Sequence, residues 1–166
     1  MNHQIKKSMK QYWPLISLVM VSMLASFAIN WKVKGDVTLW MHYFMGIFLL
    51  IFSALKIFHL KKFADGFEMY DLLAKRYRVY AYIYPFIELF LSLLYLSFIA
   101  PMLTYVLTIM ILTFGSVGVI KALKAGLDIN CPCMGSILDV PLSTVTLTED
   151  LGMVVMSFML LLMRVS

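Results

Sequence analysis

Charged residues and cysteines are scarce in this sequence of 166 residues. Only 14% of the residues are charged and 62% are hydrophobic, whereas a soluble domain has about a quarter charged and about half apolar residues. The sequence also lacks repeats, low-complexity tracts and Pro/Ser/Gly-rich linkers, which favours a single compact unit. It contains no catalytic triad pattern, phosphate loop or dinucleotide fingerprint. We therefore predict a membrane protein that is not a self-contained enzyme, with the lipid bilayer as its solvent.

Long apolar runs fill most of the chain and predict an all-α integral membrane bundle. The runs are Trp13 to Ile29, Val37 to Leu60, Val79 to Ala100, Met102 to Ile120 and Leu151 to Met163. The last run is too short to cross a bilayer unless the preceding LSTVTLTED stretch enters it as well. Pro101 is expected to mark a tight antiparallel turn between the third and fourth runs. Phenylalanines, tyrosines and an alanine at helical spacing predict one amphipathic interfacial helix over Lys61 to Arg78.

The basic residues lie at the ends of the apolar runs, and they give the chain a net charge of +5. This placement fits membrane topology and anionic lipid better than nucleic acid, for which basic residues gather on one face. Alternating spans put the N-terminus, the second-to-third connection and the fourth-to-fifth connection on one side. That side holds eleven Lys and Arg: Lys6, Lys7, Lys10, Lys56, Lys61, Lys62, Lys75, Arg76, Arg78, Lys121 and Lys124. The other side holds Lys32, Lys34 and Arg164, so the first side is predicted to be cytoplasmic.

The chain has only two cysteines, Cys131 and Cys133, which flank one proline in a polar loop. A disulfide closing so small a ring would be strained and easily reduced, as in an exchanging bond. Alternatively, the two thiolates could hold a soft ion such as Cu(I), with Met134 as an auxiliary ligand. A third interpretation leaves the thiols inert in a connecting loop. His59 is the one histidine that could join a metal site, although an interfacial role is favoured for it.

Two charges fall inside apolar runs, where an unpartnered charge is costly. Glu88 lies well inside the third run, and Lys56 lies near the end of the second. A contact between Lys56 and Glu88 on neighbouring helices is geometrically reasonable, because the long lysine side chain can reach about one turn deeper. Such a pair could fix the helix register or support a functional site.

The order of these motifs resembles the MauE/DoxX family of redox-associated membrane proteins. The similar stretches are GIFLLIFSALKIFHLKKFADGF, YPFIELFLSLLYL, CPCMG and VPLSTVTLTEDLGM, and together they run from about Phe44 to Met163. The matching positions are Lys56, Pro85, Glu88, Cys131, Cys133, Gly135 and Pro141. The resemblance implies a four-helix bundle in a bacterial-type inner membrane, associated with disulfide formation or maturation of exported redox proteins such as methylamine dehydrogenase. A thioredoxin-like partner is often found beside such proteins.

The chain departs from the family pattern in two places. Met134 stands where the family loop usually has phenylalanine, which mildly favours metal, and an additional apolar segment precedes the family helices. The charge count also places the thiols on the reducing side of the membrane. Either that orientation is wrong, or the pair passes electrons or metal from the cytoplasm.

We therefore expect residues 1–36 to form a tail and an extra transmembrane helix, and residues 37–166 to form the four-helix domain, with the Cys-Pro-Cys loop within 121–150. The first functional hypothesis is a thiol/disulfide relay through Cys131 and Cys133, supported by Lys56, Glu88, Pro85, Gly135 and Pro141. This hypothesis needs a redox partner protein and no resident cofactor. The alternatives are a Cu(I)-handling protein that uses Cys131, Cys133 and Met134, and a membrane scaffold whose cysteines are idle and which recruits an enzyme through Lys61 to Arg78.

Overall fold

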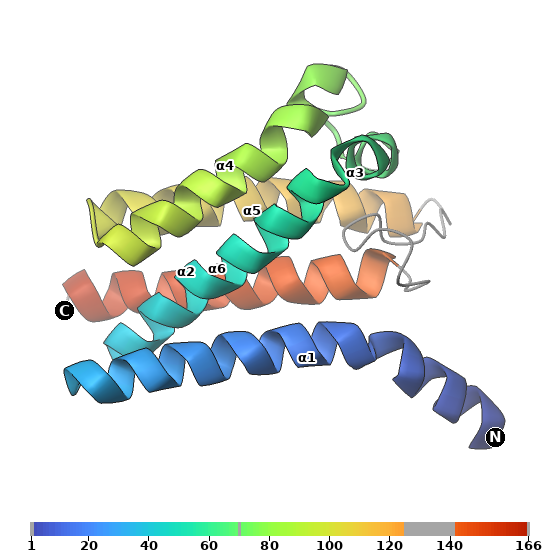
Figure 1. The fold of residues 1–166 in the computed structure, drawn as a ribbon. Helices are drawn as coiled ribbons and strands as arrows, with labels where there is room; N and C mark the ends of the chain where they lie inside the picture. Colours follow the sequence, from blue (N-terminus) through green and yellow to red (C-terminus); the bar gives the residue numbers. More distant parts are fainter. Residues whose placement is uncertain (1, 70, 125–141, 166) are drawn as a thin grey trace.

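The fold is an all-helical bundle, seen in a computed structural model that describes residues 2–69, 71–124 and 142–165 (Figure 1). The described helices are α1 (Asn2–Val33), α2 (Val37–Phe58), α3 (Leu60–Phe67), α4 (Arg78–Ser97), α5 (Pro101–Lys124) and α6 (Leu142–Val165). Helix α2 lies in the middle of the bundle and packs against α1, α4 and α6, while α5 and α6 form a closely packed antiparallel pair. The predicted fold class is thereby confirmed.

Four segments of the described chain are long and apolar enough to cross a bilayer. They are Leu15–Val33, Val37–Phe58, Arg78–Ser97 and Pro101–Ala122. Helix α6 is not among these four. It begins at Leu142 rather than Leu151, so the LSTVTLTED stretch extends the fifth apolar run into one helix of 24 residues, about 36 Å long.

Two short turns connect the spanning helices at the end of the bundle that holds the C-terminus. In the first turn, Asp36 caps α2 by accepting a hydrogen bond from the Leu39 amide at 2.8 Å. The second turn places Phe98 and Ala100 in left-handed backbone conformations before Pro101 opens α5. The Phe98 ring stacks on His42 with centroids 4.3 Å apart, which helps to hold this uncommon conformation for a bulky residue.

The prediction of one amphipathic helix over Lys61 to Arg78 is wrong beyond Phe67. Helix α3 ends at Phe67, and hydrogen-bonded turns lead to the start of α4 at Arg78. The physical reason is Asp71, whose carboxylate accepts hydrogen bonds from the amides of Leu73 and Ala74 at 2.9 and 2.8 Å. These bonds offer the backbone an alternative to a continuous helix.

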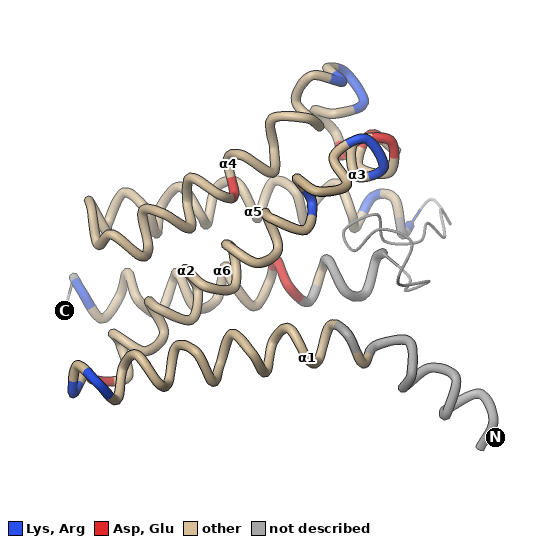
Figure 2. Tube along the Cα trace, in the orientation of Figure 1, with Lys and Arg blue, Asp and Glu red and all other residues tan. Residues whose placement is uncertain are grey.

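Basic residues gather at the two ends of the described helices, unequally (Figure 2). The end that holds α3 carries Lys56, Lys61, Lys62, Lys75, Arg76, Arg78, Lys121 and Lys124. The end that holds the turn between α1 and α2 carries Lys32, Lys34 and Arg164. The N-terminus of α1, the last residue of α5 and the first residue of α6 lie at the α3 end (Figure 1), as the alternation of spans predicts. We call it the basic end.

Candidate polar site beneath the basic end

A buried ion pair joins α2 to α4. The Nζ atom of Lys56 lies 2.6 Å from Oε1 and 2.7 Å from Oε2 of Glu88. Only 6% of the Lys56 side chain and 3% of the Glu88 side chain are exposed. The contact that the sequence predicts is therefore present, and it brings together two charges that lie 32 positions apart in the chain.

Aromatic side chains from two helices surround the lysine. Phe63 of α3 and Tyr84 of α4 each place their ring centroid 5.6 Å from Lys56 Nζ, within the range of a cation–π contact. The Phe63 ring also packs on Phe67, which closes the site from the basic end. Helix α3 therefore contributes, through Phe63, to the burial of the ion pair.

Pro85 lies inside α4, one turn before Glu88, and is buried. A proline at an interior helical position cannot donate a backbone hydrogen bond to the carbonyl four residues earlier, here that of Ala81. The backbone is therefore altered at the turn that presents Tyr84 and Glu88 to the bundle interior. The structure thus places Pro85 next to the polar site.

A second carboxylate, Asp150 of α6, is buried in the same region. A Cβ atom added at Gly115 of α5 would lie 3.6 Å from Oδ2 of Asp150 and 3.7 Å from the hydroxyl of Tyr84. Oδ2 of Asp150 and the Tyr84 hydroxyl therefore both lie beside Gly115, which places the α6 carboxylate close to the aromatic residue that flanks Lys56. Asp150 was not predicted from the sequence, although an acidic residue directly before an apolar run is a signal for such a site.

The polar site thus takes residues from α2, α3, α4 and α6, and Gly115 of α5 lies beside it. In a medium of low dielectric constant, opposite charges at hydrogen-bond distance attract strongly, and removing one of them leaves the other without compensation. The arrangement can hold the helices in one register. Helices α5 and α6, which flank residues 125–141, contribute Gly115 and Asp150 to its surroundings.

Residues 125–141 lie outside the described part of the chain, and they include Cys131, Cys133, Met134, Gly135 and Pro141. The predicted roles of these five residues therefore stay predictions. Among the residues that the structure does describe, no group of three or more His, Cys, Asp or Glu could hold a metal ion. His59 is exposed at the junction of α2 and α3.

A second buried polar cluster lies toward the opposite end of the bundle. His42 Nδ1 is 3.0 Å from the Tyr105 hydroxyl, and the Tyr95 hydroxyl lies 3.2 Å from Thr108 Oγ1 and 3.1 Å from Ser157 Oγ. These groups connect α2, α4, α5 and α6 through hydrogen bonds that satisfy buried hydroxyls. No role was predicted for His42 from the sequence, although a lone histidine inside an apolar run already signals a buried polar contact.

These features define a multi-pass helical membrane protein whose interior charges are paired close to one end of the bundle. The particular family follows from comparison with family models: the model described as methylamine utilisation protein MauE matches residues 34–163, most of the chain. The chain belongs to this family. Helix α1 precedes the matched residues. Neither a search of curated proteins nor a search of solved structures finds a match.

Proposed function

We propose that this protein supports the maturation of a partner redox protein by thiol/disulfide exchange through Cys131 and Cys133 at the membrane surface. The observation that carries the proposal is that the chain's only two cysteines lie between α5 and α6, two closely packed helices of a MauE-family bundle. Membership of a family named for methylamine utilisation links the chain to that process, and we infer from it a role in the maturation of a redox enzyme. The residues of this chain do not by themselves specify an amine.

The polar site beneath the basic end supports this proposal. Lys56 and Glu88 hold α2 against α4, and Asp150 lies on α6 only eight residues after its start at Leu142. In this proposal a fixed register of the helices limits the positions that the two thiols can take. Exchange benefits from this because the attacking sulfur must lie in line with the S–S bond of the partner. Lys56, Glu88 and Pro85 act as positioning residues in this proposal.

The exchange conserves atoms and electrons. One thiolate of the pair attacks a disulfide of a thioredoxin-like partner, which forms a mixed disulfide and releases one partner thiolate. The second thiolate of the pair then attacks the mixed disulfide. The pair is oxidised to a Cys131–Cys133 disulfide, while the partner gains two electrons and takes up two protons. The strain of so small a disulfide ring makes the reverse transfer accessible as well.

We propose further that the basic end faces the cytoplasm of a bacterial-type inner membrane. Positively charged residues near span ends are retained on that side, and the basic end carries most of them. The pair would then exchange with a cytoplasmic partner in a reducing compartment.

Trapping experiments test the exchange. The Cys133→Ser and Cys131→Ser variants should each accumulate a mixed disulfide with a thioredoxin-like protein, because the remaining thiol attacks but cannot be resolved. The double serine variant is the control and should trap nothing. Trapping by neither single variant would contradict the proposal.

The single serine variants also distinguish thiol/disulfide exchange from the Cu(I) alternative. The position of Met134 beside Cys133 favours that alternative. For a Cu(I) site, the purified wild-type protein should bind the ion, each serine variant should lose it, and Met134→Leu should weaken it while keeping size and apolarity. Copper binding without trapping would replace the redox proposal. If neither occurs under reducing, metal-replete conditions, the scaffold interpretation replaces both.

A further inference from the structure

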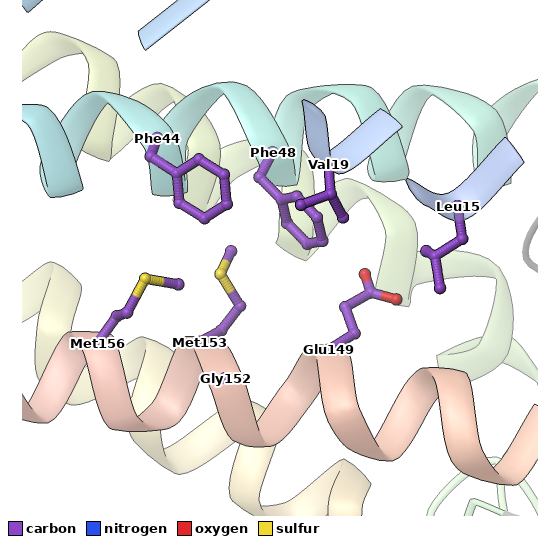
Figure 3. Close-up of a pocket in the computed structure, with 8 residues that line it drawn as sticks. All are labelled: Leu15, Val19, Phe44, Phe48, Glu149, Gly152, Met153 and Met156. Atoms are coloured by element: carbon purple, nitrogen blue, oxygen red, sulfur yellow. The ribbon is translucent and has the colours of Figure 1, made fainter. Parts of the chain in front are cut away.

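A cavity of about 180 Å³ lies between α1, α2 and α6 (Figure 3). Phe44 and Phe48 of α2 face Met153 and Met156 of α6 across it, and Leu15 and Val19 of α1 line it as well. The walls are apolar along most of their length. One charged side chain interrupts them: Glu149 of α6, whose carboxylate points into the space between the helices in Figure 3.

The cavity is polar at one end and apolar at the other. Leu15 begins the apolar span of α1, and Glu149 lies in the polar first half of α6, so both lie toward the basic end. Phe44 and Met156 lie at the opposite end of the cavity in Figure 3, farther into the bundle. The carboxylate is thus close to the level of the lipid headgroups, and the apolar walls continue toward the bilayer centre. This gradient matches an amphiphile that enters with its headgroup at the basic end.

The free space extends over Gly152, the residue of α6 that faces the cavity between Glu149 and Met153. A Cβ atom added at Gly152 would meet no other group within 4 Å. Gly152 is exposed and lines the cavity, so a side chain introduced here begins in open space at the cavity's edge.

We propose that this cavity binds a phospholipid with a primary ammonium headgroup, one acyl chain lying between Phe44, Phe48, Met153 and Met156. The ammonium donates a charge-assisted hydrogen bond to the Glu149 carboxylate, and such a bond is shorter and stronger than one between neutral groups. A quaternary ammonium has the same charge but no N–H to donate, so the site discriminates between the two headgroups. The lining residues of this site take no part in the proposed thiol exchange, so the inference does not depend on the redox proposal. Because α1 supplies Leu15 and Val19, it also depends on the helix that precedes the matched family residues.

Lipid retention by the full-length protein tests this site. The protein is purified in detergent micelles that contain phosphatidylethanolamine and phosphatidylcholine with identical acyl chains in equal amounts, and bound lipid is measured by native mass spectrometry. The wild-type protein should retain the ethanolamine lipid with about tenfold preference, the magnitude expected from one hydrogen bond to a charged group. Glu149→Gln should lose this preference while still retaining some lipid, because the apolar walls remain.

Two further variants make the result decisive. Gly152→Leu should lose retention of both lipids because it fills the cavity, and Gly152→Ala, which meets no neighbour, should fold like the wild type and retain an intermediate amount. Asp36→Asn, at the other end of the bundle, is the control and should keep the wild-type preference.

Equal retention of the two lipids by the wild type would overturn the proposal. So would an unchanged preference in Glu149→Gln, or full retention by a folded Gly152→Leu variant.

Discussion

The ammonium group of Lys56 sits between the two carboxylate oxygens of Glu88, at 2.6 and 2.7 Å, with both side chains almost fully buried. The pair links the last turn of α2 to the middle of α4, and Phe63 and Tyr84 shield it. Buried pairs contribute little net stability compared with well-packed apolar residues, but breaking one leaves an uncompensated charge. The pair therefore specifies how α2 and α4 align more than it adds to stability.

The first prediction concerns this pair. Glu88→Ala should lower the free energy of unfolding by about 3–5 kcal/mol, because it leaves the Lys56 charge buried without its partner. Combining Glu88→Ala with Lys56→Met should recover part of this loss. Equilibrium unfolding in mixed detergent micelles measures both variants and the Lys56→Met single variant. Strictly additive losses would show that the two residues are not coupled.

The matched control is the exposed pair of Arg78 and Asp65, whose side chains are 54% and 48% exposed. Solvent screening reduces the attraction in such a pair. Asp65→Ala should therefore change the free energy of unfolding by less than about 1 kcal/mol. A loss as large as that of Glu88→Ala would mean that burial does not distinguish the two pairs.

The second prediction concerns the pH dependence of the corner between α3 and α4. Burial raises the pKa of the Asp71 carboxyl above its ordinary value. The hydrogen bonds that the carboxyl accepts from two backbone amides lower the pKa, but by less than burial raises it. The proton is therefore bound more tightly in the folded state, so the contribution of Asp71 to stability is full below the ordinary pKa and is lost as the pH rises through the raised pKa.

Asp71→Asn should remove this pH dependence, because the amide keeps an oxygen acceptor for Leu73 and Ala74 without carrying a charge. Thermal unfolding between acidic and neutral pH should show a smaller change in midpoint for the variant than for the wild type. Asp71→Ala removes the acceptor as well and should cost about 1 kcal/mol at every pH. If the unfolding midpoint of wild type and of Asp71→Asn changed identically with pH, Asp71 would be excluded as the source of the pH dependence.

The third prediction concerns the close approach of α2 and α4 at Gly46. The Ser92 hydroxyl donates a 2.8 Å hydrogen bond to the Gly46 carbonyl, and a Cβ atom added at Gly46 would lie 2.8 Å from Leu96 Cδ2 and 3.2 Å from Tyr95 Cβ. Gly46→Ala should therefore destabilise the protein by about 1–3 kcal/mol. Adding Leu96→Ala removes the nearest clash, so the double variant should be less destabilised than the sum of the single variants in unfolding measurements.

The fourth prediction concerns orientation. In a chain carrying Cys131→Ser and Cys133→Ser, single cysteines are introduced by Lys32→Cys and Lys75→Cys, which replace exposed residues at opposite ends of the bundle. A membrane-impermeant thiol reagent applied to intact cells should label the Lys32→Cys variant only, because the basic end is expected inside. Permeabilised cells provide the control and should show labelling of both. The reverse pattern in intact cells would place the basic end outside.

Much of the architecture could be predicted from local composition. A transmembrane helix is recognised by its own apolar length, because in a bilayer each helix satisfies its backbone hydrogen bonds internally. The contact of Lys56 with Glu88 was also predictable, since two charges inside apolar runs of neighbouring helices have few other ways to avoid isolation. The end of α3 was not predictable from periodicity, because hydrogen bonds to Asp71 override an otherwise helical pattern of apolar residues.

The sequence by itself determined the class of protein, the approximate spans and the unequal distribution of basic residues, because each of these depends on residues that are neighbours in the chain. Only the tertiary structure decided that Asp150 and Tyr84 both lie beside Gly115, that His42 meets Tyr105, and that α1, α2 and α6 line a cavity that includes Glu149. These relationships depend on how each helix is rotated and where it crosses its partners. Those quantities are set by side-chain packing between residues that are distant in sequence.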